Sequence, residues 1–521
     1  MFSVSTLPAL LAVVLAANVY AASNPIVDVG YARYQGALDP STNITSFIGV
    51  RFAAPPLRFA APQPPAKVSG VQIANTASPE CFQGSDGTSV NQTFHKRVTD
   101  SEDCLFLNVF LPGQLSTTPK LPVVVWIHGG GYVKGSAVGL DGGDLIRDAQ
   151  GGVIAVTIQY RLGVFGFLAG AETKNRGALN AGLLDQTFAL QWVQKHIAAF
   201  GGDPNRVTIW GQSAGAGSVL QHVVANGGRT NPPLFHAAIT SSTFLPSQHN
   251  FDDPVPEQIY ADVAAQTKCS AASDTFACLQ NVDASILQAA NSNISLSGFL
   301  GTFIFVPVVD GKLIVERPTQ TLAKGRVNGK LYLGMTNQFE GRNFVKGTVT
   351  TGTLASYVGN LFPGLGSAQV NQVVQAYSNI GLTDTLNQAI AVMGESTFIC
   401  PTYFLLKAFS SASYKGEFAI PPANHADDTK YYFLSNPGFN NTAFITSFSQ
   451  SFLAIVKSSN PNTTPDPTNI TPQWNLWSSG NTEMLFNRTT ALQPDIRPIT
   501  TDAGLLSRCS LWENLSAFTP Q

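Results

Sequence analysis

Uninterrupted apolar runs separated by a helical pattern constrain the fold of this chain more than any other feature. Residues 121–127, 153–158 and 207–210 are predicted strands, and residues 329–334 and 431–434 are predicted shorter, later ones. Continuous rather than alternating apolarity is typical of strands buried on both faces. Between the second and third runs, one face of an amphipathic helix ending at Gly201-Gly202 carries Leu184, Phe188, Trp192, Val193, Ile197 and Phe200. Alternating strands and helices predict an α/β fold with a large, mostly parallel central sheet flanked by helices on both faces.

The composition fits one large domain, and its low charge suits an uncharged organic substrate. The chain has 521 residues, 44% of them hydrophobic, which is ample for a sizeable core. We expect residues 22–521 to form a single domain, as α/β proteins of this length often do. Only 12% of the residues are charged, the net charge is -2, and no basic block occurs. Nucleic-acid binding therefore has no electrostatic basis in this sequence.

The N-terminus predicts export. Residues 7–19 are apolar and small residues follow, so residues 1–21 are predicted to be a signal peptide cleaved after Ala21. The region ahead of the apolar stretch lacks Lys and Arg, and the alternative is a buried first helix. No later stretch reaches about 18 consecutive apolar residues, so we expect no membrane span. Residues 515–521 carry no hydrophobic tail for a lipid anchor. We therefore predict a secreted, extracellular protein.

Glycosylation triplets and cysteines agree with export. Eight Asn-x-Ser/Thr triplets begin at Asn43, Asn91, Asn293, Asn440, Asn462, Asn469, Asn487 and Asn514. Six cysteines are an even number, which fits three disulfides in an oxidising compartment, with buried free thiols as the alternative. Proximity along the chain favours the pairs Cys81–Cys104 and Cys269–Cys278, which leaves Cys400–Cys509.

The strongest chemical signal is Gly-Gln-Ser-Ala-Gly at residues 211–215. It directly follows the strand at residues 206–210 and opens a helical pattern that runs to about residue 224. A strand, a sharp turn and a helix are the context of the G-x-S-x-G nucleophile elbow. Side chains at both flanking positions would clash in so tight and strained a turn, which explains the two glycines. We therefore expect Ser213 to be a nucleophile at the positive end of the following helix.

A second glycine segment, His-Gly-Gly-Gly at residues 128–131, follows the strand at residues 121–127. Acyl transfer needs N–H donors aimed at the developing oxyanion, and glycines let the backbone present them unobstructed. We expect the donors to be the N–H groups of Gly130, Gly131 and Ala214. The alternative is an ordinary glycine-rich turn.

A serine nucleophile needs a general base, and histidine is the usual one. In the α/β-hydrolase fold that the elbow predicts, the chain order is serine, acid, histidine. That order excludes His95, His128 and His196, which precede the serine. His222 lies on the same helix as the serine, and His236 and His249 leave too little chain for an intervening acid. His425 remains as the candidate base. His425 is predicted to lie in a polar loop that precedes the strand at residues 431–434.

The acid should end a strand between Ser213 and His425. Glu340 follows the run at residues 333–339 and precedes a glycine. Asp310 competes, although Asp310-Gly311 is more typical of a hairpin turn. The residues alone favour Glu340 without excluding Asp310.

At this point the chain resembles a known family. Residues 46–53, 55–59, 101–109, 200–204 and 305–311 are similar to motifs of the type-B carboxylesterases, in the cholinesterase and Candida rugosa lipase superfamily. The resemblance covers nearly all of the mature chain and implies a secreted, fungal serine carboxylic-ester hydrolase that works through an acyl-enzyme on Ser213. It also implies the three disulfides given above. Because the motif holding Asp310 is not catalytic in the family, the resemblance favours Glu340.

The chain departs from the family pattern at two places. Gln212 precedes the nucleophile, where the family usually has Glu, so a buried negative charge is missing and the pH profile is expected to differ. The loop between Cys81 and Cys104 holds only Phe82 and Phe94 as aromatics. Without a tryptophan for cation–π binding, choline esters are not the expected substrates. The loop is also polar and lacks the apolar stripe of a lipase lid, which favours soluble esters.

The resemblance places Phe303 and Gly301 in the acyl pocket, with Phe94 as a further pocket residue. Glycine at position 301 is expected to open the pocket to aromatic or medium-length acyl groups, including feruloyl groups. The first alternative function is a lipase or sterol esterase. A remote alternative is a non-catalytic, cholinesterase-like adhesion protein.

No cofactor is expected, because no His, Cys and carboxylate cluster has metal-ligand spacing and no dinucleotide or phosphate-loop motif occurs. The predicted partner is a small ester, and the sequence makes no prediction of oligomeric state.

Overall fold

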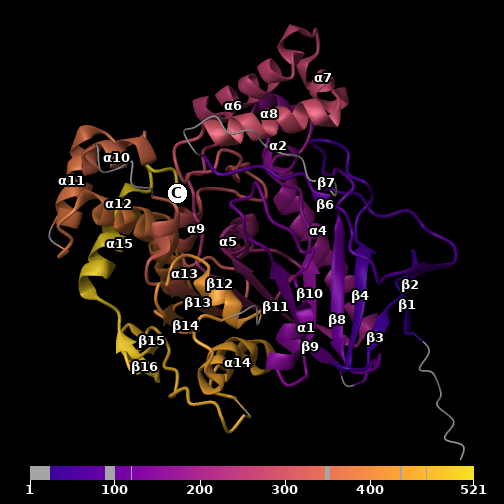
Figure 1. The fold of residues 1–521 in the computed structure, drawn as a ribbon. Coiled ribbons are helices and arrows are strands. Elements are labelled where there is room, and N and C mark those ends of the chain that lie inside the picture. Colours follow the sequence, from indigo (N-terminus) through magenta and orange to yellow (C-terminus); the bar gives the residue numbers. More distant parts are fainter. Residues whose placement is uncertain are drawn as a thin grey trace, which may run out of the picture.

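A computed structural model describes residues 24–87, 100–118, 120–345, 352–378, 380–433, 437–464 and 466–521. Its centre is an 11-stranded sheet (Figure 1). From one edge to the other the strands are β16 (Pro494–Thr500), β15 (Thr482–Arg488), β14 (Ser413–Phe418), β13 (Leu331–Asn337), β12 (Ala237–Ser241), β11 (Gly202–Gln212), β9 (Leu121–Ile127), β10 (Ile154–Ile158), β8 (Phe106–Pro112), β4 (Ile44–Arg51) and β3 (Ala37–Asp39).

The strands from β10 to β15 are all parallel, and antiparallel strands flank them at both edges. The predicted α/β class and mostly parallel sheet are therefore confirmed. The carboxyl ends of parallel strands meet at one edge of a sheet, which is where such folds place their sites. Here β11, β13 and β14 each lead into one of the predicted catalytic residues.

Two hydrophobic cores cover the two faces of the sheet. Strand β9 shows why its sequence is continuously apolar: Val123 and Val125 pack into one core, and Val124 and Trp126 into the other. The first core includes helices α4 (Ala181–His196), α5 (Ala214–Gly228) and α13 (Cys400–Phe409). The second includes α1 (Gly142–Asp148) and α14 (Thr442–Ser458).

Further elements surround this framework (Figure 1). The other helices are α2 (Gly163–Phe167), α3 (Ala171–Arg176), α6 (Pro254–Gln266), α7 (Thr275–Asn281), α8 (Ala284–Ser297), α9 (Pro318–Ala323), α10 (Leu354–Leu361), α11 (Ser367–Ser378), α12 (Thr385–Gly394) and α15 (Ala503–Leu515). Short 3₁₀ helices are η1 (Ile197–Phe200), η2 (Cys269–Ala271), η3 (Glu340–Asn343) and η6 (Asp427–Tyr431), and η5 (Glu395–Ile399) is a π-helix. One small sheet contains β1 (Ile26–Asp28), β2 (Arg33–Gln35) and β5 (Val71–Ile73). Another contains β6 (Glu80–Cys81) and β7 (Asp100–Ser101).

The predicted strand at residues 431–434 is wrong. Tyr431 ends η6, and Tyr432 and Phe433 follow it outside any strand. The three aromatic side chains are buried in the second core, against residues such as Phe448 of α14. Their apolarity therefore reflects packing of a short helix, and His425 follows strand β14 rather than preceding a strand.

The three predicted disulfides are present as Cys81–Cys104, Cys269–Cys278 and Cys400–Cys509. The last one ties α13 to α15 across 109 residues of sequence.

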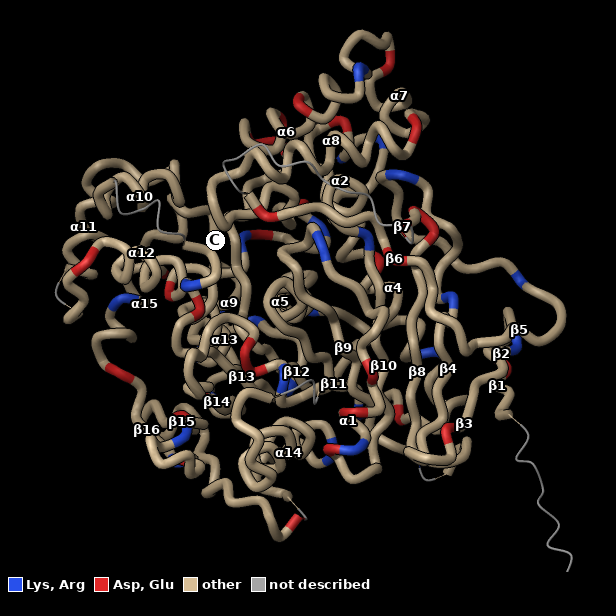
Figure 2. Tube along the Cα trace, in the orientation of Figure 1, with Lys and Arg blue, Asp and Glu red and all other residues tan. Residues whose placement is uncertain are grey.

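The continuous helical run Thr385–Phe409 is long and apolar enough to cross a membrane, but 89% of its most apolar window is buried inside the protein. Charged residues are scattered over the chain rather than gathered in one block (Figure 2). The predicted signal peptide lies outside the described residues, and a single domain remains a prediction.

Candidate active site

Ser213 occupies the turn between β11 and α5. Its backbone has φ 57° and ψ -124°, a strained conformation for a residue with a side chain. A Cβ at Gly211 would lie 2.3 Å from the carbonyl carbon of Gly215, and a Cβ at Gly215 would lie 2.0 Å from the carbonyl oxygen of Ile127. Both glycines are therefore required by sterics, as the motif predicts.

The predicted oxyanion donors lie around this turn. Gly129 packs directly on the elbow, because a Cβ there would lie 3.0 Å from Cβ of Ser213. Gly130 and Gly131 follow with φ 108° and 64°. Among the described residues, the N–H groups of Gly130, Gly131 and Ala214 have no hydrogen-bond acceptor. Unpaired N–H groups at a glycine turn and at a helix start can stabilise an oxyanion.

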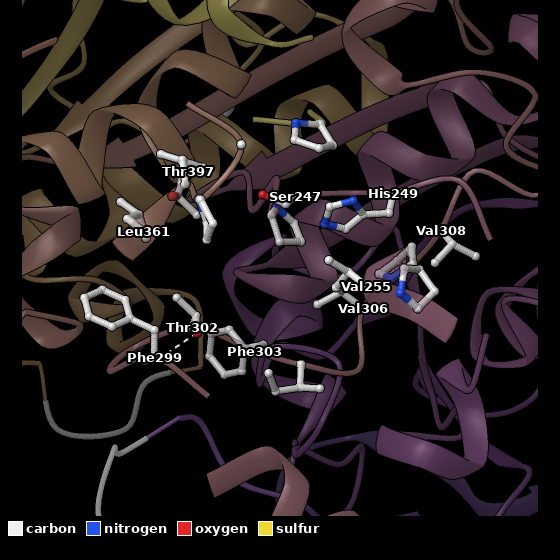
Figure 3. Close-up of a pocket in the computed structure, with 18 of the residues that line it drawn as sticks. Ser247, His249, Val255, Phe299, Thr302, Phe303, Val306, Val308, Leu361 and Thr397 are labelled. Carbon is white, nitrogen blue, oxygen red and sulfur yellow. Dashed lines mark hydrogen bonds between the residues drawn. The ribbon is translucent and has the colours of Figure 1, made fainter. Parts of the chain in front are cut away.

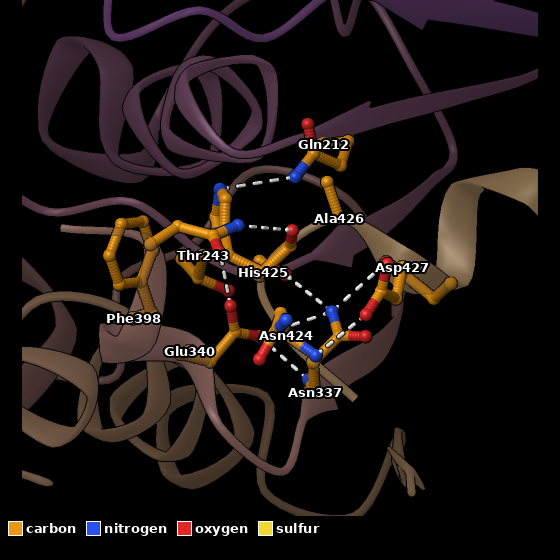
Figure 4. A network of polar contacts seen from close by, with 12 residues as sticks. Gln212, Thr243, Asn337, Glu340, Phe398, Asn424, His425, Ala426 and Asp427 are labelled. Carbon is orange, nitrogen blue, oxygen red and sulfur yellow. Dashed lines mark hydrogen bonds and ion pairs between the residues drawn. The ribbon is translucent and has the colours of Figure 1, made fainter. Parts of the chain in front are cut away.

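His425 and Glu340 form a buried pair beside the elbow (Figure 4). Glu340 begins η3, just after β13, and His425 lies in the loop after β14. His425 Nδ1 is 2.6 Å from Oε2 of Glu340, and the backbone N–H of Asn337 donates to Oε1 of Glu340 at 2.7 Å. A proton on Nδ1 leaves Nε2 as the basic nitrogen, the tautomer that accepts a proton from serine.

Gln212 contacts that basic nitrogen, a relationship that the sequence did not reveal. Its side-chain Nε2 lies 3.2 Å from His425 Nε2, within hydrogen-bond distance (Figure 4). The amide donates, because Nε2 of the neutral imidazole is an acceptor in this tautomer. Ser213 Oγ makes no hydrogen bond to a described residue, so Gln212 is the partner of Nε2 in this state.

Four phenylalanine rings form an aromatic wall next to His425. Phe398 and Phe344 place their ring centres 4.5 and 5.0 Å from the imidazole. Phe303 packs edge-on against Phe344 and Phe244, and Phe244 stacks on Phe398. Phe398 comes from the π-helix η5, a distortion often found at functional sites. Of these rings the sequence predicted only Phe303.

An apolar cavity of about 510 Å³ lies beyond the aromatic wall (Figure 3). Phe303 and Gly301 line it, as do Phe244, Phe299 and Met393. Gly301 does not widen the cavity in the way the sequence suggested. A Cβ at Gly301 would lie 2.2 Å from the carbonyl oxygen of Phe344, so the backbone of Phe344 already fills that space. Phe94, the third predicted pocket residue, lies outside the described residues.

Asp310, the competing acid, is held in a structural role. Its Oδ2 accepts a hydrogen bond from Asn180 Nδ2 at 2.7 Å, and its Oδ1 accepts hydrogen bonds from the backbone N–H groups of Lys312 and Ile314.

Two other buried histidines contact neighbouring side chains away from the triad. His128 stacks on Tyr160 and His222 contacts Gln186, and burial lowers the pKa of each imidazole to about 4.

Most predicted glycosylation sites lie at the surface. Asn43, Asn293, Asn440, Asn462 and Asn514 are exposed, and Asn469 and Asn487 are half-buried. Asn91 lies outside the described residues.

Within the described part of the chain, no three His, Cys, Asp or Glu residues gather in a way that could hold a metal ion.

Comparisons with known proteins find similar fungal lipases and carboxylesterases. Secreted lipase 1 from Botryotinia fuckeliana is 36% identical over 347 residues, which are 61% of this chain and 60% of that lipase. Carboxylesterase patB from Penicillium expansum is 29% identical over 518 residues, 86% of this chain and 90% of that protein. The crystal structure of EstA from Aspergillus niger superposes with a TM-score of 0.85 at 30% identity, over 96% of this chain and 99% of EstA. A model described as the carboxylesterase family matches residues 23–497, and the chain therefore belongs to the carboxylesterase family.

Proposed function

We propose that the protein is a secreted serine hydrolase of carboxylic esters with Ser213, His425 and Glu340 as its catalytic triad. The observation that carries the proposal is the meeting of a strained serine elbow, unpaired N–H groups and a buried His–Glu pair at the ends of β11, β13 and β14. Secretion is supported by the signal-like N-terminus, by the three disulfides and by relatives that are named secreted lipases.

The mechanism follows from the positions of these groups. Ser213 Oγ attacks the ester carbonyl carbon while its proton moves to Nε2 of His425. The carbonyl oxygen becomes an oxyanion facing the N–H groups of Gly130, Gly131 and Ala214. The proton then passes from His425 to the alcohol that leaves, and the acyl-enzyme remains. Water hydrolyses the acyl-enzyme with His425 as base and again as acid. Glu340 keeps the imidazole oriented and stabilises its charged form.

Gln212 must move for the first step to occur. Nε2 of His425 has one lone pair, and in this structure the Gln212 amide lies against it. Rotation of the Gln212 side chain away from Nε2 frees the lone pair for the proton of Ser213.

The apolar cavity supports a substrate with an aromatic or medium-length acyl group, such as a feruloyl ester. Phe303 faces the oxyanion segment on one side, since a Cβ at Gly131 would lie 2.1 Å from its ring. On the other side it lines the cavity of about 510 Å³. An acyl group bound at Ser213 would therefore meet Phe303 first and the apolar cavity behind it.

A lipase is the second candidate function. Relatives named lipases favour it, and so do Val255 and Phe518, which line the cavity and are 47% and 43% exposed. Such apolar side chains at a cavity rim suit contact with lipid. Activity that rises sharply when a triglyceride passes its solubility limit would support this candidate over a soluble-ester hydrolase.

The test is hydrolysis of p-nitrophenyl acetate, butyrate and octanoate and of methyl ferulate by the purified protein. The proposal predicts activity that Ser213→Ala abolishes, with kcat/KM highest for butyrate, octanoate or ferulate. Strict preference for acetate would contradict the substrate proposal. Equal activity of the wild type and Ser213→Ala would contradict the proposal that Ser213 is catalytic. Activity that depends on Ser213 would also exclude a non-catalytic adhesion protein.

A further inference from the structure

Asp428 is a buried acid that the mechanism above does not use. It lies in η6, three positions after His425, and its side chain is fully buried. Asn337 Nδ2 donates to its Oδ1 at 3.0 Å, and the hydroxyl of Tyr432 donates to its Oδ2 at 2.7 Å. Both carboxylate oxygens are therefore acceptors, as in an ionised acid.

Asn337 connects this acid to Glu340. Its backbone N–H donates to Glu340 Oε1, and its side-chain nitrogen is 3.5 Å from the same oxygen. The same nitrogen also donates to Ser242 Oγ at 3.1 Å. Asn337 is fully buried, so its amide is held in one orientation between the two carboxylates. Figure 4 shows Asn337 beside Glu340.

Two neighbouring buried carboxylates repel each other unless a positive charge balances them. The titratable groups that face Asp428 are Glu340 on η3, His425 in the preceding loop and Tyr432 after η6. On its own element, Asp427 and Lys430 pair with each other at 3.0 Å. Burial raises the pKa of Asp428 to about 6; Glu340 adds to the rise, whereas hydrogen bonds from Asn337 and Tyr432 and the charge of His425 oppose it. The imidazolium that forms when His425 accepts the serine proton therefore lies where its positive charge can balance both acids.

We propose that Asp428 is a positioning residue that fixes Glu340 through Asn337 and supplies a second negative charge behind the imidazolium of His425. This inference rests on the proposed function, because the imidazolium forms only when His425 accepts the serine proton. It gives His425 two acids, one in direct contact and one acting through Asn337.

Asp428→Asn tests the proposal with little change in shape. The new amide can accept from Asn337 and donate to Tyr432, whose hydroxyl hydrogen can turn to Ser241 Oγ at 3.0 Å. We expect kcat to fall about tenfold, the equivalent of one pKa unit, with KM unchanged. The acid limb of kcat/KM should move to lower pH, because the imidazolium loses a stabilising charge.

The matched control is Asp427→Asn, the same change one residue earlier. Asp427 is half-buried, and an Asn there can still accept the backbone N–H of Asn424. We expect wild-type kcat and pH profile from this control. If Asp428→Asn and Asp427→Asn give the same kcat and the same profile, the proposal is wrong.

Tyr432→Phe provides a second variant that keeps the core packed, since the ring still contacts Trp210 and Phe448. Loss of the hydrogen bond from Tyr432 raises the pKa of Asp428, so less of this acid is ionised at about pH 6. Activity should therefore fall at about pH 6 and stay at the wild-type level at about pH 8. An unchanged profile would contradict the proposal.

An NMR titration of His425 separates this inference from the proposed function. We expect a lower pKa of His425 in Asp428→Asn than in the wild type, whether or not the protein hydrolyses an ester. Equal values in the two proteins would overturn the role of Asp428. A wild type without esterase activity would count against the proposed function alone.

Discussion

The side-chain amide nitrogen of Gln212 lies 3.2 Å from Nε2 of His425, the atom that has to accept the proton of Ser213. A neutral amide at this position adds no charge to the site, whereas a carboxylate would attract a proton onto the imidazole. The residue before the nucleophile therefore influences both the geometry and the charge of the base.

The first prediction concerns this charge. Gln212→Glu should raise the pKa of His425, because the new carboxylate stabilises the imidazolium. Catalysis requires neutral His425, so the acid limb of kcat/KM should move to higher pH, with activity lost near about pH 6 and retained in alkaline buffer. Gln212→Met is the neutral control and should not move the limb upward. An unshifted limb in Gln212→Glu would show that position 212 does not control the base.

The oxyanion segment yields a second prediction. Gly131→Ala places a Cβ 2.1 Å from the Phe303 ring and at φ 64°, so the donor N–H must shift. We expect kcat to fall about a hundredfold, the effect of losing one oxyanion donor. Gly139→Ala is the matched control, since it has φ 81° but nothing within 4 Å of the added Cβ. Equal kcat for the two variants would place the oxyanion donors elsewhere.

Phe303 is predicted to separate the catalytic serine from the apolar cavity. Phe303→Ala should increase the ratio of kcat/KM for octanoate to kcat/KM for acetate by about tenfold, since buried methylenes contribute on the order of 1 kcal/mol each. Phe299→Ala enlarges the same cavity at a residue that packs on Tyr357, and it should leave the ratio unchanged. A ratio unaltered by Phe303→Ala would mean that acyl chains do not enter this cavity.

The two candidate acids can be told apart directly. Glu340→Gln should lower kcat by about a thousandfold or more, because His425 loses the partner that fixes its tautomer and stabilises its charge. Asp310→Asn should change stability but leave kcat near the wild-type value, since among the described residues the Asp310 carboxylate bonds to Asn180 and to the nearby backbone of Lys312 and Ile314 and not to His425. Thermal unfolding and steady-state kinetics on both variants show which acid is catalytic. A larger loss of kcat in Asp310→Asn would reverse the assignment.

The sequence predicted the buried central strands β9, β10, β11 and β13, but it missed β12, which lies between β11 and β13 and is equally buried, and also β14, whose sequence is partly polar. Strand β14 contains Lys415, which is buried and pairs with Glu483 at 3.0 Å. A buried ion pair leaves no apolar run to recognise, so β14 was not predicted. The reverse error occurred at residues 431–434, where aromatic side chains that pack against α14 resemble a strand.

The candidate site divides in the same way. Ser213 and the glycine segment were predictable because an elbow is a local motif, and His425 followed from chain order. The contact of Gln212 with His425, the wall formed by Phe398 and Phe344, and the link from Asn337 to Asp428 depend on how distant segments pack. No spacing in the sequence encodes these relationships.

The most direct test of the central claim is covalent labelling with a fluorophosphonate, followed by mass spectrometry of the intact protein and of its peptides. We predict one added phosphonate per chain, located on Ser213, and no adduct on Ser213→Ala. Equal labelling of the wild type and of Ser213→Ala would contradict the assignment of Ser213 as the nucleophile.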